Sequence, residues 1–203
     1  MKNNFQFKDK ISKEEIITLP RKKFAGEIFY IDSLLGADQF LDKLNGKTVL
    51  GFDTETRPAF KKGVVNEVAL LQLSTENQAF LFRLNVMGIP PQIAQLLSNP
   101  AITKAGVAIH DDILGLQRLV KFKPAGFIEL QDYVKEFGIK DNGLKKLSAN
   151  ILGIQISKRQ QTSNWESEVL TRAQIEYAAT DAWVCHQIFS VLQKVKRYNG
   201  HKG

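Results

Sequence analysis

Two carboxylates stand two residues apart in Phe52-Asp53-Thr54-Glu55, at the end of an otherwise apolar run. Side chains at positions i and i+2 of a β-strand project to the same face, so both acids would point the same way. Like charges held this close repel, and a divalent cation relieves the repulsion because Mg²⁺ and Mn²⁺ prefer oxygen ligands. The pair therefore suggests a metal site, although an isolated Asp-x-Glu is more often a solvated pair in a turn.

A second acidic pair, Asp111 and Asp112, follows residues 103–109, which read as a buried strand. Sites in α/β sheets usually lie beyond the carboxyl ends of such strands. The alternative is a helix N-cap followed by a first-turn acid, which the helix dipole favours. Leu116 and Leu119 follow Asp112 at helical spacing, which places Asp112 on the inward face. We therefore expect Asp112 to be a ligand and Asp111 to be the cap.

The third feature is Tyr177 and Asp181, four residues apart on a predicted helix and hence on one face. The residues between and after them are small, which would let the helix approach another backbone closely. A hydroxyl satisfied by a carboxylate can be purely structural, so this pair also leaves two interpretations open.

The order and spacing of the three features resemble the tyrosine subclass of the DEDD 3′→5′ exonucleases, the group of ribonuclease D and the Werner syndrome helicase exonuclease domain. The resemblance runs from about residue 48 to 190. Besides the acids, it is carried by VALLQL at 68–73, KAGV at 104–107, GLKKL at 143–147, SNW at 163–165 and QIEYAATDA at 174–182.

This resemblance implies a ribonuclease H-like fold and hydrolysis of phosphodiester bonds at the 3′ end of DNA or RNA, with release of nucleoside 5′-monophosphates. It assigns Asp53, Glu55, Asp112 and Asp181 to two divalent ions, Mg²⁺ or Mn²⁺. It assigns Tyr177 to the attacking water. A phenol with an ordinary pKa of about 10 is expected to orient that water rather than to deprotonate it.

Substrate contacts are predicted at five further positions, on charge, polarity or stacking capacity: Thr54, Arg57, Lys61, Lys158 and Trp165. The basic residues could hold phosphates, and an indole ring could stack on a base. Lys145 and Lys146 are interpreted instead as a solvated helix face.

The predicted fold class is α/β, with a mixed sheet of five to six strands flanked by helices. Three strands with short connections, at 48–55, 67–74 and 78–84, predict an antiparallel meander. Further strands are expected at 25–32 and 103–109, and helices at 33–44, 90–97, 112–120, 131–137, 144–152 and 172–196. Residues 1–23 are expected to form a partly ordered leader, and 24–203 a single exonuclease domain.

The chain has 203 residues and a formal net charge of +7, which is compatible with a polyanionic partner. Its one cysteine, Cys185, excludes an intrachain disulfide. We find no signal peptide and no apolar run of the ~18 residues that a membrane span needs. The expected location is therefore the cytoplasm, and no membrane partner is expected.

Two other functions remain open at this point. One is a catalytically silent member of the same fold that binds nucleic acid or acts as a scaffold. The other is an α/β enzyme of sugar or phosphate metabolism, which would need a Gly-rich phosphate loop that we do not find. The intact acids favour the exonuclease, because a silent protein has no physical need to keep mutually repelling carboxylates together.

Overall fold

The computed structural model describes residues 7–200, except 45, 60, 62 and 64. At its centre lies one mixed six-stranded sheet in the order β1-β4-β3-β2-β5-β6. The strands are β1 (Glu27–Ile31), β2 (Val49–Thr56), β3 (Val68–Ser74), β4 (Gln78–Arg83), β5 (Thr103–Gly106) and β6 (Phe127–Glu129). The mixed α/β class predicted from the sequence is confirmed.

The middle of the sheet is the predicted antiparallel meander. β2 pairs with β3, and β3 pairs with β4 across a short hairpin, both antiparallel. β1, β5 and β6 add to this meander through parallel pairings. Every residue of β3 is buried, so both faces of the sheet must be covered by helices.

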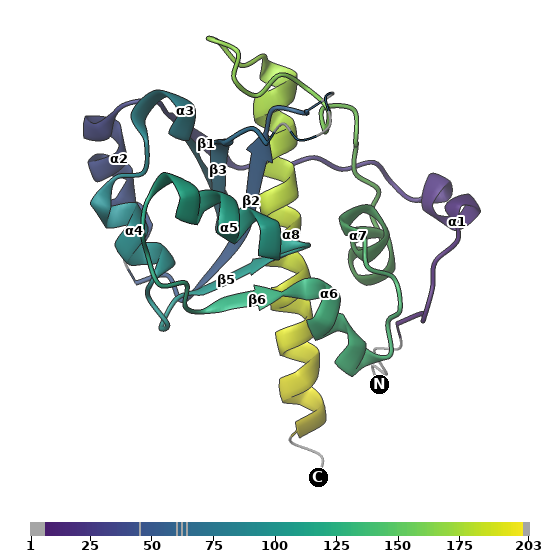
Figure 1. Cartoon of the computed structure of the whole chain (residues 1–203). Helices are drawn as coiled ribbons and strands as arrows, with labels where there is room; N and C mark the ends of the chain where they lie inside the picture. Colours follow the sequence, from purple (N-terminus) through teal and green to yellow (C-terminus); the bar gives the residue numbers. More distant parts are fainter. Residues whose placement is uncertain (1–6, 45, 60, 62, 64, 201–203) are drawn as a thin grey trace.

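Figure 1 shows how the helices divide between the two faces. One face packs on helices α2, α4 and α5, whose residues join those of the sheet in a single apolar cluster. The long helix α8 lies across the other face. The helices are α1 (Lys13–Thr18), α2 (Leu34–Leu41), α3 (Leu84–Met87), α4 (Pro91–Leu97), α5 (Ile109–Leu119), α6 (Leu130–Tyr133), α7 (Leu144–Leu152) and α8 (Arg172–Gly200), with 3₁₀ turns at Asp42–Leu44 and Val134–Phe137.

Two predicted boundaries around α5 were wrong. β5 ends at Gly106 instead of residue 109, and α5 begins at Ile109 instead of residue 112. Asp111 and Asp112 consequently lie inside the first turn of a helix. The strand β6 was not predicted, because its three half-buried residues are too few to show an alternating pattern.

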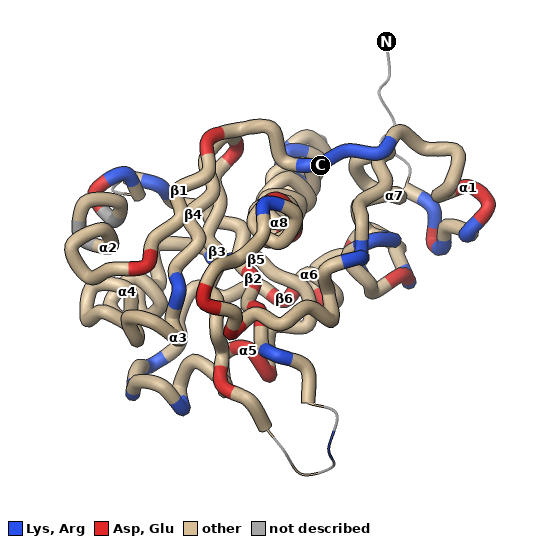
Figure 2. Tube along the Cα trace, turned by 90° about the horizontal axis from the view of Figure 1, so that it is seen from above, with Lys and Arg blue, Asp and Glu red and all other residues tan. Residues whose placement is uncertain are grey.

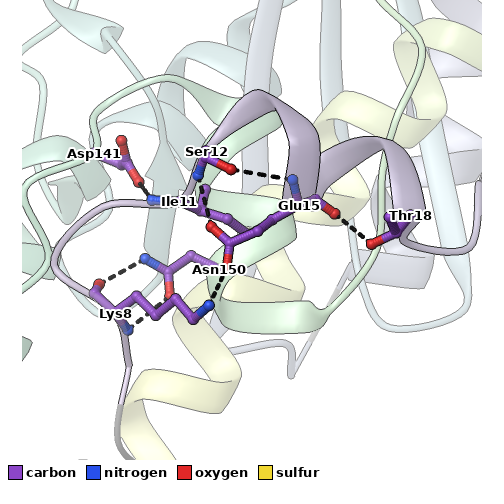
Figure 3. A network of polar contacts seen from close by, with 7 residues as sticks. All are labelled: Lys8, Ile11, Ser12, Glu15, Thr18, Asp141 and Asn150. Carbon is purple, nitrogen blue, oxygen red and sulfur yellow. Dashed lines mark hydrogen bonds and ion pairs between the residues drawn. The ribbon is translucent and has the colours of Figure 1, made fainter.

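The segment 7–23 contains a helix that the sequence analysis did not predict. Helix α1 begins with a capping box, in which the side chains of Ser12 and Glu15 each accept from the other's backbone N–H. Figure 3 shows how the segment is attached to the domain: the Ile11 N–H donates to Asp141 Oδ2 at 2.7 Å, and the Asn150 amide bonds both backbone groups of Lys8. These contacts hold the segment against α7.

Among the described residues, no helix combines the length and the apolar character needed to cross a membrane.

Candidate active site

The side chains of β2 alternate between the two faces of the sheet. Leu50 and Phe52 are fully buried in the apolar cluster on the α2–α5 face. Asp53 and Glu55 therefore project to the opposite face, toward α8. There they meet Asp181, and the three side chains offer carboxylate oxygens that all lie within 4.8 Å of one another.

Helix α8 reaches the strand closely because both surfaces are small. Gly51 of β2 has no room for a β-carbon beside the Ala182 carbonyl. Ala178 and Ala179, on the same helix, are fully buried. This close approach brings Asp181 to Asp53, as expected from the small residues around the Tyr-x-x-x-Asp pattern.

Asp112 reaches the same place from the other side of β2. The Thr54 hydroxyl donates to Asp112 Oδ1 at 2.6 Å. Asp112 is not one of the three acids that crowd within 4.8 Å, but it lines the same cavity. Thr54, predicted to contact substrate, therefore has its hydroxyl engaged in orienting Asp112.

The start of α5 is held by a residue from a neighbouring strand. The backbone N–H groups of Ala108 and Ile109 donate to the two carboxylate oxygens of Glu129, at 3.0 and 2.8 Å. Ala108 is the N-cap, with φ 60° and ψ 38°, a conformation that costs energy for a residue with a side chain. The prediction that Asp111 caps this helix was wrong: the helix starts earlier, and Asp111 lies in its first turn.

Burial raises the pKa of each of these four acids, and repulsion from the other acids of the site adds to it for Asp53 and Glu55. Burial, then the charges of Asp181 and Asp112, raise the pKa of Asp53 well above its usual value. Burial and the Asp53 charge raise the pKa of Glu55 to about 10. Burial raises the pKa of Asp112 to about 6 and also raises that of Asp181, where Lys158 opposes it. Such a group of acids is costly to ionise without a cation.

Tyr177 lies one helical turn before Asp181 and faces the same cavity. Burial, followed by the charges of Asp181 and Glu55, raises the pKa of its hydroxyl above the ordinary value. The phenol consequently stays protonated at neutral pH and can donate a hydrogen bond.

Trp165 is fully buried, with its ring centroid 6.0 Å from that of Tyr177. A ring without an exposed face cannot stack on a base, so the predicted substrate contact at Trp165 was wrong. The indole instead packs beside Tyr177 within an apolar cluster.

The acids and three lysines together line a cavity of about 430 Å³. Lys158 Nζ lies 3.3 Å from Asp181 Oδ2 and 5.8 Å from the Tyr177 ring centroid. Lys145 and Lys146 also line the cavity; Lys145 is exposed on α7, in keeping with a solvated helix face, and Lys146 Nζ pairs with Asp141 Oδ1 at 2.9 Å. We call this the acidic pocket; it is lined by Asp53, Thr54, Glu55, Val107, Ala108, Asp112, Gln131, Gly143, Leu144, Lys145, Lys146, Lys158, Gln161, Tyr177, Asp181 and Cys185.

Arg57 and Lys61 do not line the acidic pocket in the described part of the chain. Arg57 Nη1 pairs with Glu166 at 3.1 Å, and both side chains remain partly exposed. Lys61 is exposed in the connection between β2 and β3. Their predicted contact with substrate stays a prediction.

The donor set suits a hard divalent cation. Its ligand atoms are carboxylate oxygens, which Mg²⁺ and Mn²⁺ prefer. Asp181 Oδ1 is buried and has no hydrogen-bond partner among the described residues, which is costly for a carboxylate unless a cation completes its coordination. The residues present therefore fit a metal site.

A sequence model of the 3′–5′ exonuclease family matches residues 28–196. The chain is 35% identical over 175 residues to the bifunctional 3′–5′ exonuclease/ATP-dependent helicase WRN of Mus musculus, covering 81% of this chain and 12% of that protein. It is 28% identical over 130 residues to ribonuclease D of Haemophilus influenzae, covering 63% of this chain and 32% of that protein. The chain thus spans only a minor part of these two relatives.

Among solved structures, the Nibbler EXO domain of Aedes aegypti superposes with a TM-score of 0.77 at 22% identity, covering 87% of this chain and 93% of that chain. This likeness shows a shared ribonuclease H-like fold, as the sequence resemblance implied. The family match covers most of the chain and includes β2, α5 and the part of α8 that carries the acids. The chain belongs to the 3′–5′ exonuclease family.

Proposed function

We propose that this chain removes nucleotides from the 3′ end of a DNA or RNA strand by hydrolysis, with the acidic pocket as its active site. The observation that carries the proposal is the convergence of Asp53, Glu55 and Asp181 oxygens within 4.8 Å. In the reaction, a bond forms between water oxygen and phosphorus, and the bond from phosphorus to the 3′ oxygen breaks. The products are a nucleoside 5′-monophosphate and a strand shortened by one nucleotide with a free 3′-hydroxyl.

We assign Asp53, Glu55, Asp112 and Asp181 to two divalent ions, Mg²⁺ or Mn²⁺. Four carboxylates carry a formal charge of about −4, which two divalent cations balance. When bound, such a pair of ions stabilises the charge that develops on the attacking and leaving oxygens.

The remaining roles belong to side chains that do not bind metal. The protonated Tyr177 donates a hydrogen bond that orients the attacking water beside Asp181. Lys158, which lines the same cavity, provides a positive charge for the phosphate. Thr54 fixes the rotamer of Asp112 through its hydroxyl. A cavity lined by both carboxylates and lysines thus matches a metal-assisted reaction on an anionic substrate.

The test uses single strands and recessed duplexes of DNA and RNA, labelled at the 3′ or 5′ end, with Mg²⁺, Mn²⁺ or EDTA. We expect stepwise shortening from the 3′ end, abolished by EDTA and by Asp53→Asn. Asp132→Asn, which alters an exposed acid paired with Lys135, is the matched control and should retain full activity. Equal cleavage by Asp53→Asn would refute the assignment. Strand binding without any shortening by the wild type would instead support the silent nucleic-acid-binding alternative.

A further inference from the structure

The chain leading from α1 to β1 is fixed beside the active site. The Lys22 N–H donates to the Gln155 carbonyl at 3.0 Å, and the Gln155 N–H donates to the Pro20 carbonyl at 3.0 Å. The buried Phe24 N–H donates to Thr180 Oγ1 at 3.0 Å, immediately before Asp181. In Figure 1 this connection passes α8 on its way from α1 to the sheet. Residues 20–24 therefore have a defined path.

This path forms one side of a second cavity, of about 480 Å³, which we call the basic cleft. Tyr177 lines both the basic cleft and the acidic pocket. The consecutive residues Lys158 and Arg159 line the acidic pocket and the basic cleft, respectively. The two cavities are thus neighbours across Tyr177. The basic cleft is lined by Arg21, Lys22, Lys23, Ser157, Arg159, Gln160, Ala173, Glu176, Tyr177 and Thr180.

The charge of the basic cleft is positive and largely uncompensated. Its one acid, Glu176, is already held by Lys23 at 2.9 Å and by Arg172 at 3.0 Å. Arg21, Lys22 and Arg159 are exposed, and no ion pair to them occurs within the described residues. Figure 2 shows basic positions along the connection that leads from α1 past α8. Three cations are consequently available to an anionic ligand.

We propose that the basic cleft binds backbone phosphates of the substrate strand, on the 5′ side of the nucleotide held in the acidic pocket. This inference rests on the proposed function. A polyanion passing from the acidic pocket over Tyr177 would meet the three cations in turn, and each phosphate neutralised by Lys or Arg strengthens binding through release of counterions. Contacts to phosphates carry no sequence preference. Only a strand long enough to extend from the acidic pocket into the basic cleft would make them, so the cleft would favour longer strands over shorter ones.

Part of the proposed phosphate contact would lie outside the region that the family match covers. Arg21 and Lys22 precede residue 28, where the match to the family begins, whereas the acids all lie inside it. Hydrogen bonds of the N-terminal segment with Asn150 of α7 and with Gln155 fix the backbone that carries these two side chains. The segment is therefore expected to control the dependence on strand length, and the acids to control the chemistry.

The proposal is tested by binding without cleavage. Asp53→Asn protein in EDTA is titrated into fluorescent single-stranded DNA of two lengths, a dinucleotide and an oligonucleotide of about 12 nucleotides. Arg21→Ala/Lys22→Ala/Arg159→Ala is compared with Lys121→Ala/Lys123→Ala, two exposed lysines that line neither cavity.

We expect the triple variant to bind the longer strand about ten-fold more weakly, with a salt dependence reduced by two to three phosphate contacts, about 0.7 each in the slope of log K against log salt. Dinucleotide binding should be unchanged, as should both affinities of the control. If the triple variant has a lowered Tm, Lys22→Glu at an exposed position replaces it in the same titrations. Unchanged affinity for the longer strand, or equal loss for both lengths, would overturn the proposal.

The 3′-end cleavage assay of the wild type and of the triple variant, run beside these titrations, separates this proposal from the proposed function. A wild-type chain that never shortens a strand, but whose binding depends on these three residues, would refute the hydrolysis alone. A chain that cleaves both lengths equally with and without the three residues would refute the cleft alone. Polyglutamate is the competitor that tests for an acidic protein partner. If it displaces the bound strand and binds more tightly than the oligonucleotide, the cleft is reassigned to such a partner and the phosphate proposal is refuted.

Discussion

Gly51 of β2 lies directly against the backbone of Ala182 in α8, with no room between them for a β-carbon. Such an atom would collide with the Ala182 carbonyl oxygen and lie 2.7 Å from the His186 nitrogen. Asp53 is two residues along β2, and Asp181 precedes Ala182. This backbone contact therefore sets the distance between the acids of the two elements.

Gly51→Ala should move α8 away from β2. Added volume in a packed interior typically costs about 1–3 kcal/mol, so the free energy of unfolding should fall by that amount in a urea titration. Affinity for Mn²⁺, measured by calorimetry, should fall as well, because Asp181 moves away from Asp53. Wild-type values for both would show that the contact does not set the geometry.

The metal-free protein should lose stability as the pH rises. The pKa of Glu55 is raised to about 10 and that of Asp112 to about 6, both mainly by burial. A carboxyl whose pKa is higher in the folded state favours folding while it is protonated. That stability is fully present below the unfolded pKa of about 4, and it is lost as the pH rises through the folded value.

Urea titrations in EDTA at pH 5 and pH 8 measure this effect. Glu55→Gln removes one of the titrating groups, so the variant should lose less stability than the wild type between the two pH values. Saturating Mg²⁺ or Mn²⁺ should restore the wild type at pH 8. Identical pH dependence in the wild type and the variant would contradict the assignment of Glu55.

Tyr177→Phe should slow turnover by about 10²-fold while Mn²⁺ affinity stays close to the wild-type value. The phenyl ring preserves packing against Trp165 but cannot orient water. Tyr133→Phe is the matched control, because it removes a hydroxyl that accepts from Gln193 and does not line the acidic pocket. A large loss of metal affinity in Tyr177→Phe would show that the tyrosine has a different role.

Glu129→Gln should disturb Asp112 without touching it. The amide can replace only one of the two acceptors that hold the N–H groups of Ala108 and Ile109. We expect a loss of about 1–3 kcal/mol in the free energy of unfolding, together with lower Mn²⁺ affinity, because the first turn of α5 shifts. Ala108→Gly relieves the positive φ and is expected to stabilise the same turn. If Glu129→Gln binds Mn²⁺ normally, Glu129 has only a structural role.

The sequence by itself determined the direction of several key side chains. Period-two alternation placed Asp53 and Glu55 on one face of a strand, and helical spacing placed Tyr177 and Asp181 on one face of a helix. These relations are local, since they depend only on the geometry of one element. The short connection between β3 and β4 likewise determined their antiparallel pairing.

The tertiary structure alone decided which surfaces meet. The start of α5 depends on Glu129, from a strand that no periodicity predicted, and the true cap of that helix is Ala108. Burial removed Trp165 from the predicted substrate contacts, and folding brought Lys145 into the acidic pocket. Each of these outcomes depends on long-range packing between elements distant in sequence, and a local pattern of residues holds no information about that packing.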